Sequence, residues 1–185
     1  MQIYHPNIQA IQQQTMQLDH ASCVHCKKSQ QLISHGFVRK KRTGGEPESV
    51  GKRVFCSNRN NRTGCGRTMQ LYIDSILRYL HRSGHVIVEF VLALNAGQTI
   101  QNAYHRATGC EVPARQAYRW LHRLAMQMSY YRSLFHQPPL DDKPNMTLNR
   151  PVRLITLHST FTLLIQQFGQ PLCSAYQWQL QRSFL

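Results

Sequence analysis

Apolar residues recur at helical spacing through the second half of the chain. Residues 97–128 predict two helices joined by a short turn at Gly109, and the apolar run of residues 85–97 predicts a helix ahead of them. Another apolar stripe predicts a helix over residues 152–168, which Gly169 ends. This half of the chain is therefore expected to be helical.

The paired helices of residues 97–128 are amphipathic. Thr99 can cap the first helix, because its hydroxyl can accept a hydrogen bond from the helix N-terminus. The positions expected to face inward are Ile100, Ala103, Tyr104 and Ala107 in the first helix, and Ala117, Trp120, Leu121, Leu124 and Met128 in the second. Tyr118, Tyr130 and Tyr131 are expected to pack inside and not to stack on bases. Two helices joined by a short turn that contains glycine are typical of a helix-turn-helix.

Shorter and more polar elements are expected in the first half of the chain. Residues 1–22 are rich in glutamine and carry apolar residues at loosely helical spacing, which predicts a short helix or a flexible arm. Residues 32–42 predict a strand and then a turn, residues 51–56 a strand leading back, and residues 68–73 a closing strand. A small β-structure with a basic hairpin therefore precedes the helices.

Four cysteines flank these strands at the spacing of a metal site. Cys23 and Cys26 form a CxxC knuckle, in which a tight turn lets two thiolates bind one tetrahedral ion. Cys56 and Cys65 complete the pattern C-x2-C-x29-C-x8-C, and Gly66 allows the backbone to turn round the metal. The sequence therefore predicts one structural Zn²⁺, whose binding contributes about 10–16 kcal/mol to folding a segment with few large apolar side chains.

Other interpretations of the cysteines stay open. His20 or His25 could replace one cysteine as a ligand, and the thiols could be structural without a metal. A redox role for the CxxC is disfavoured, because no βαβ pattern surrounds it. Cys110 and Cys173 are isolated and are expected to be small core residues.

The predicted fold is mostly α with a small β zinc ribbon. Four prolines and little apolar content mark the stretch before the last helix as a linker. The expected domains are a Gln-rich arm or short helix over residues 1–22, a zinc ribbon over residues 23–73, a helical domain with a helix-turn-helix over residues 74–136, a linker over residues 137–151, and a helical C-terminal segment over residues 152–185.

Basic residues greatly outnumber acidic ones. The chain has 22 Lys+Arg and 8 Asp+Glu, which gives a net charge of +14. Residues 23–68 hold eleven basic and two acidic residues, and residues 98–136 hold five basic and one acidic. A charge of this size and clustering is typical of a nucleic-acid-binding protein.

The N-terminus and the hydropathy pattern favour a cytoplasmic, nucleoid-associated protein. No Lys or Arg precedes Lys27, whereas a signal peptide begins with basic residues. No apolar run approaches the roughly 18 residues that a membrane span requires, so no membrane partner is expected.

The candidate DNA contacts lie in the two basic segments. Arginine can bind guanine edges and glutamine adenine edges, and either can hold phosphate. A loop clamped at both ends by zinc would also suit phosphate contact. The residues expected to contact DNA are Arg115, Gln116, Arg119 and Arg123 on the outer face of the second helix, Arg59 and Arg62 in the loop between the last two cysteines, and Arg39, Lys40, Lys41 and Arg42 in the hairpin. The alternative for residues 97–128 is an ordinary helical hairpin with a solvated cationic face.

Residues 20–130 resemble the N-terminal half of bacterial insertion-sequence transposases and of their small accessory proteins. The resemblance is carried by the CxxC, the basic hairpin, "CGRT" with its following strand, and helices that end in "AYRWLHRL". It implies a zinc ribbon followed by a helix-turn-helix that binds transposon-end DNA. It also implies metal-ligand roles for Cys23, Cys26, Cys56 and Cys65, and recognition-helix roles for Arg115, Gln116 and Arg119.

The expected function is that of a zinc-stabilised accessory or regulatory DNA-binding factor of a mobile element. The partners would be double-stranded DNA and a recombinase encoded nearby, and the chain could form a homodimer. Strand transfer needs three metal-binding carboxylates, but only Asp141 and Asp142 follow Glu111, so an enzyme is not expected. The alternatives are a stand-alone transcription regulator and an RNA-binding zinc-ribbon protein, the latter disfavoured because Phe37, Phe55 and Tyr72 are few for such a module. The catalytic subunit of a recombinase is disfavoured by the same lack of carboxylates.

Overall fold

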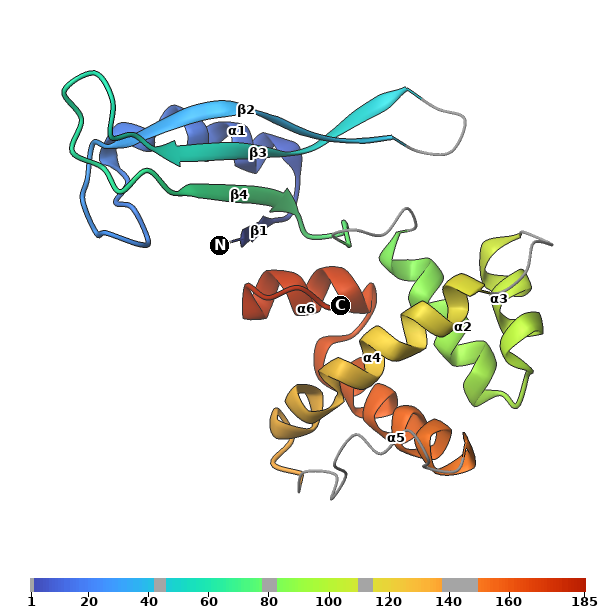
Figure 1. The fold of residues 1–185 in the computed structure, drawn as a ribbon. Helices are drawn as coiled ribbons and strands as arrows, with labels where there is room; N and C mark the ends of the chain where they lie inside the picture. Colours follow the sequence, from blue (N-terminus) through green and yellow to red (C-terminus); the bar gives the residue numbers. More distant parts are fainter. Residues whose placement is uncertain (1, 42–45, 78–82, 110–114, 138–149) are drawn as a thin grey trace. The chain divides into compact units, whose positions relative to one another are not determined.

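The computed structural model describes residues 2–41, 46–77, 83–109, 115–137 and 150–185. The chain has a mixed α/β fold and divides into two compact units (Figure 1). The first unit comprises Met1–His81 with Tyr176–Ser183, and the second comprises Arg82–Ala175 with Phe184–Leu185. Each unit is described by itself below.

The first unit is built on a four-stranded sheet, counted over the described residues, with the strand order β1-β4-β3-β2. The strands are β1 (Gln2–His5), β2 (Leu32–Lys41), β3 (Pro47–Cys56) and β4 (Thr68–Ile73). β2 pairs with β3 and β3 with β4 in antiparallel fashion, whereas β1 runs parallel to β4. The three strands predicted from the sequence are present, and β3 begins before the expected residue 51.

The N-terminal residues belong to this unit, and they include a strand that the sequence did not predict. β1 pairs with β4 from Gln2 to His5, and it is followed by α1 (Ile8–Met16) and a short 3₁₀ helix, η1 (Leu18–His20). Asn7 caps α1 by accepting a hydrogen bond from the backbone N–H of Ala10 at 2.8 Å. Of the two expectations for residues 1–22, the short helix is present, and these residues do not form a separate arm.

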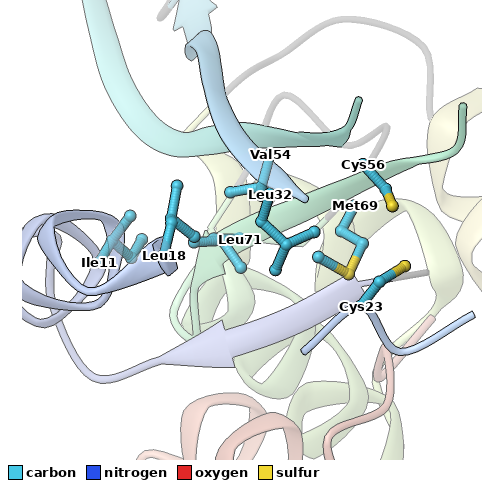
Figure 2. Packing of buried hydrophobic residues seen from close by; sticks show 8 residues of the cluster. All are labelled: Ile11, Leu18, Cys23, Leu32, Val54, Cys56, Met69 and Leu71. Atoms are coloured by element: carbon cyan, nitrogen blue, oxygen red, sulfur yellow. The ribbon is translucent and has the colours of Figure 1, made fainter. Parts of the chain in front are cut away.

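α1 and η1 cover one face of the sheet and complete its core (Figure 2). The buried cluster consists of Ile11, Leu18, Cys23, Leu32, Val54, Cys56, Met69 and Leu71. Ile11 and Leu18 lie at one end of this cluster, and the sulfur atoms of Cys23 and Cys56 lie at the other. The cysteine segment therefore packs a larger apolar core than its own sequence offers, because an amphipathic helix from outside it covers the sheet.

The second unit is helical, with α2 (Gly84–Asn95), α3 (Ile100–Thr108), α4 (Arg115–Ser133) and α5 (Arg150–Phe168). α6 (Leu172–Leu180) contains residues of both units. Thr99 caps α3 by accepting a hydrogen bond from the N–H of Asn102 at 3.2 Å, and Gly109 ends this helix, both as predicted. None of the described helices is both long enough and apolar enough to cross a membrane.

Three aromatic rings join α2, α3 and α4. The ring centroid of Trp120 lies 5.5 Å from that of Phe90 and 5.2 Å from that of Tyr104. The predicted inward positions of α3 are all buried, and those of α4 are buried except for the half-buried Leu121. The helix pair of residues 97–128 is therefore present, with its polar face turned away from this aromatic core.

Several sequence-based expectations fall outside the described residues. These are the contacts of Arg42, the packing of Cys110, and residues 138–149 of the expected linker. Cys173 is described and is buried, as predicted for a small core residue. The predicted C-terminal helix is present as α5 and ends before Gly169.

Candidate functional site

The first pair of cysteines lies on a tight turn that follows η1. The N–H of Cys23 donates to the carbonyl of Lys28 at 2.9 Å, and the N–H of Lys27 donates to the carbonyl of Cys23 at 2.8 Å. The N–H of His25 points at the sulfur of Cys23, with a donor–acceptor distance of 3.4 Å. The turn therefore presents the thiols of Cys23 and Cys26 on one side and supports a sulfur with a backbone N–H.

The second pair lies where β3 leaves the sheet. The N–H of Cys65 points at the sulfur of Cys56 at 3.3 Å, and the N–H of Gly66 donates to the carbonyl of Cys56 at 2.9 Å. Gly66 has a φ of 70°, the left-handed conformation that its predicted turn needs. At Gly64 a Cβ atom would lie 2.7 Å from the sulfur of Cys56 and 2.3 Å from the carbonyl oxygen of Ser57. Only glycine allows the backbone to pass so close to the sulfur.

The four sulfur atoms lie at the corners of a site that fits one tetrahedral ion. All four lie within 4.8 Å of one another. The Cys23 and Cys65 sulfurs are 3.8 Å apart, and those of Cys26 and Cys56 are 3.7 Å apart. A tetrahedron with Zn–S bonds of about 2.3 Å has edges of roughly 3.8 Å. The spacing of the thiols thus matches zinc coordination by four cysteines.

The same distances exclude a disulfide among these cysteines, and the make-up of the cluster bears on the histidine alternative. A disulfide needs an S–S distance of about 2.05 Å, far below the distances observed here, and all four thiols are free. The cluster found among the described residues contains neither His20 nor His25. The sequence alone left a histidine ligand open, and the geometry favours the four-cysteine set.

The thiols differ in how readily they lose a proton. Burial raises the pKa of Cys23, but the backbone N–H groups of Cys26 and His25 lower it, and the net result is a pKa of about 7. Burial also raises the pKa of Cys56. This effect is larger than the lowering by the backbone N–H of Cys65, and the pKa of Cys56 is about 12. A metal ion binds thiolates, so metal binding at this site must displace the proton of Cys56.

Hydrogen bonds fasten the loop between Cys56 and Cys65 to the first knuckle. Arg62 donates from Nη1 to the carbonyl of Gln30 at 2.6 Å, and Lys28 donates from Nζ to the carbonyl of Thr63 at 2.7 Å. The N–H of Thr63 donates to the side-chain carbonyl of Gln31 at 2.9 Å. Much of the loop's polar composition therefore connects the two halves of the cysteine cluster.

Two asparagines of this loop adopt left-handed backbone conformations. Asn60 and Asn61 have φ angles of 50° and 63°. Asparagine tolerates this left-handed conformation better than most residues. Arg59, by contrast, is exposed, and its guanidinium has no hydrogen-bond or ionic partner among the residues that the structure describes. Of the two loop arginines expected to contact phosphate, Arg59 has a guanidinium without a partner in the described part of the chain, whereas Arg62 is bound to the carbonyl of Gln30.

Of the hairpin residues expected to contact DNA, Arg39, Lys40 and Lys41 lie on β2, and Arg42 lies outside the described residues. Arg39 is exposed and Lys40 is half-buried. In the strand register Lys40 lies opposite Glu48, so its charge is partly balanced on the neighbouring strand. Lys41 is the last residue of β2. The hairpin thus carries an exposed arginine near its outer end.

The candidate DNA contacts of α4 differ in their availability. Arg115 and Arg119 are exposed, and Arg123 is half-buried. Gln116 accepts a hydrogen bond from the hydroxyl of Tyr104 through its side-chain carbonyl, at 3.3 Å. That bond joins α3 to α4, so Gln116 already has a structural role in addition to the base contact expected from the sequence.

Sequence reasoning missed a part of the α4 surface. Tyr118 was expected to pack inside, but 59% of its surface is exposed. It lies on one helical face with Arg115, Arg119, His122 and Met126, all of them exposed. Their spacing of three and four residues is visible in the sequence and places them on one helical face, but this spacing alone does not show whether the Tyr118 ring is buried. Tyr131, also expected inside, is buried.

Comparisons of the chain with models of protein families, with curated proteins and with solved structures found no match. The geometry of the cysteine cluster and of the basic surfaces is therefore the basis for a function.

Proposed function

We propose that the chain is a DNA-binding protein whose first unit is held by one structural Zn²⁺ and whose α3–α4 pair binds duplex DNA. The observation that carries the proposal is the exposed face of α4 made by Arg115, Tyr118, Arg119, His122 and Met126. No acidic residue occurs between residues 115 and 133, so nothing on α4 repels phosphate. We call this surface the α4 face.

In the second unit, α4 is packed so that one of its faces is available to enter a groove of duplex DNA. The aromatic contacts of Trp120 with Phe90 and Tyr104 fix α4 on its inner side, which leaves the α4 face outward. Arg115 and Arg119 are one helical turn apart, and both guanidinium groups lack partners among the described residues. Arginines placed in this way can bind guanine edges in the major groove or the flanking phosphates.

The proposed zinc site is structural. Four cysteine sulfurs fill a tetrahedral coordination shell, whereas a catalytic zinc keeps one position open for water or substrate. Cys23, Cys26, Cys56 and Cys65 would hold the ion, and it would join the turn before β2 to the end of β3. We therefore propose a binding protein and not a zinc enzyme.

We further propose that the chain acts as an accessory or regulatory factor of a mobile element, with a recombinase as its protein partner. The support is the resemblance of residues 20–130 to the N-terminal half of insertion-sequence transposases. A stand-alone transcription regulator would use the same surfaces on DNA. Co-purification of a recombinase encoded next to this chain supports the accessory role, and normal transposition after deletion of the chain contradicts it.

Fluorescence anisotropy with labelled duplex DNA tests the DNA-binding proposal. The double variant Arg115→Ala with Arg119→Ala should weaken binding to a preferred duplex by about 1–3 kcal/mol and weaken binding to random duplex less. Arg132→Ala, in the last turn of the same helix, is the matched control and should retain binding. Equal affinity of the double variant and the control would contradict the proposed role of α4.

A further inference from the structure

The face of the sheet that α1 does not cover is only partly buried. Side chains alternate between the two faces along a strand, so Val54, Met69 and Leu71, which pack in the core with α1, have neighbours that point the opposite way. These neighbours form two rows across the strands. Ile33 pairs with Phe55 and Phe55 with Thr68 in one row, and Arg53 pairs with Gln70 in the next.

His35 joins these rows because the ladder between β2 and β3 is irregular there. The register shifts between Ser34 and Phe37, and the ring of His35 lies 5.8 Å from that of Phe55. We call the surface formed by Ile33, His35, Arg53, Phe55, Thr68 and Gln70 the open face. Three of its members are exposed, namely His35, Arg53 and Thr68, and the other three are half-buried.

The open face combines stacking groups with a free positive charge. Phe55 and His35 provide two neighbouring rings, and the planar guanidinium of Arg53 lies in the adjacent row. Arg53 has no hydrogen-bond or ionic partner among the described part of the chain. Gln70 accepts a hydrogen bond from the hydroxyl of Tyr72 at 2.9 Å, which leaves its amide N–H groups to donate to a ligand.

The charge around the open face narrows the choice of ligand. Residues 20–45 and 49–73, which include all of its members, contain no Asp or Glu. A second copy of this chain would bring the same excess of positive charge, so self-association through this surface is disfavoured. A protein partner with an apolar surface would find only Ile33 and Phe55 as purely apolar contacts. A polyanion with flat aromatic groups fits both the charge and the rings.

We propose that the open face binds the unpaired bases of single-stranded DNA. Bases would stack on Phe55 and His35, Arg53 would contact phosphate, and the amide of Gln70 could donate to a base edge. Stacking of this kind tolerates any sequence, because every base offers a π-face. The inference rests on the proposal that this chain binds DNA, and it adds a second site that recognises unpaired strands, as found where a duplex is opened.

A matched pair of phenylalanine variants tests the proposal. Phe55 lies on the open face, whereas Phe37 pairs with Lys52 on the opposite side of the same sheet, where Lys52 donates to the hydroxyl of Thr15 in α1. Phe37 is exposed to 45%, so its replacement should disturb the fold little. Binding of the zinc-loaded full chain to a labelled single-stranded oligonucleotide is measured by anisotropy for Phe55→Leu, Phe37→Leu and Arg53→Gln.

We expect Phe55→Leu to weaken binding to a thymidine oligonucleotide about fivefold or more, as expected for loss of stacking with one base. Binding to an abasic oligonucleotide of equal length should stay unchanged, since it offers only phosphates. Arg53→Gln should weaken binding to both, and Phe37→Leu should weaken neither. If Phe55→Leu and Phe37→Leu bind alike, or if the wild type binds abasic and thymidine strands equally, the proposal is wrong.

Two further measurements keep the outcome unambiguous. A thymidine strand carrying 5-iododeoxyuridine is cross-linked to the wild type by light, and the attachment site is found by mass spectrometry, which needs no variant to fold. Attachment within β2 or β3 supports the open face, and attachment confined to α4 overturns it. Binding of an RNA strand but not of the DNA strand also overturns it. Duplex binding, measured in parallel with the α4 variants, reports separately on the proposed function.

Discussion

The side chain of Gln181 forms two hydrogen bonds with the backbone of Tyr4, at the other end of the chain. The N–H of Tyr4 donates to Oε1 of Gln181 at 2.8 Å, and Nε2 of Gln181 donates to the carbonyl of Tyr4 at 3.1 Å. β1 is an edge strand, so the amide of Gln181 satisfies the outward backbone groups of Tyr4 in the way a further strand would. These bonds tie Gln181, which follows α6, to β1 within the first unit.

Removal of this amide should destabilise the first unit. Gln181→Ala removes two hydrogen bonds from the backbone of Tyr4, whose surroundings are dry because Tyr4 is only 1% exposed. We expect a loss of about 1–3 kcal/mol in the free energy of unfolding, measured by urea denaturation. The matched control is Gln179→Ala, an exposed glutamine in α6. Equal stabilities of the two variants would show that the hydrogen bonds contribute nothing.

Removal of zinc should unfold the first unit and leave the second folded. The four sulfurs join segments on either side of the β2–β3 hairpin, and structural zinc contributes about 10–16 kcal/mol to small modules that depend on it. With a strong chelator, amide exchange should become fast in β2–β4 and stay slow in α2–α4. Slow exchange in both units after complete zinc loss contradicts this prediction.

The cysteine assignment is tested by the metal content of native protein. Cys65→Ser should lower the zinc content from one ion per chain and weaken the affinity for what remains, because a serine hydroxyl is a poor zinc ligand. Cys173→Ala removes a thiol that is buried elsewhere and directed at the carbonyl of Gly84, so it should keep the full zinc content. Native mass spectrometry measures both, and an unchanged zinc content in Cys65→Ser rules out the site.

The close approach of the Gly64 backbone to the Cys56 sulfur predicts that a substitution at Gly64 weakens zinc binding. Gly64→Ala places a methyl group against the sulfur of Cys56 and the carbonyl of Ser57, so the loop must shift. We expect weaker zinc binding by roughly tenfold or more, the size of effects that follow from disturbing groups around metal ligands. Thr63→Ala, at the neighbouring exposed position, keeps its backbone hydrogen bond and serves as the control in a competition titration with a zinc indicator.

Substitutions of the two loop arginines should have different effects, one on the stability of the first unit and the other on DNA binding. Arg62 binds the carbonyl of Gln30, so Arg62→Ala should lower the thermal stability of the first unit. The Arg59 side chain is exposed, and its guanidinium has no partner among the described residues, so Arg59→Ala should keep stability and lower the slope of log K against log salt by about 1. Calorimetry and salt titrations of duplex binding measure the two effects. The reverse pattern would assign the phosphate contact to Arg62.

Features that depend on neighbouring residues were determined by the sequence itself. The spacing of Cys23 and Cys26, the cap at Thr99 and the end of α3 at Gly109 each involve groups within a few residues of one another, and all are present in the structure. The inward positions of α3 followed from helical periodicity for the same reason. The pairing of the two knuckles was also predictable, because a CxxC needs a second pair of ligands to close a tetrahedral site.

Only the tertiary structure decided the features that join distant segments. The sequence of β1 has only four residues, too few to predict a strand by themselves, and β1 forms because it pairs with β4, more than sixty residues away. Arg62 and Arg59 are alike in sequence, yet the fold brings the carbonyl of Gln30 to one of them only. The open face likewise depends on which strands are adjacent and where the β2–β3 register shifts. Periodicity indicates that a side chain points to one side of an element, but the packing of distant segments determines what lies there.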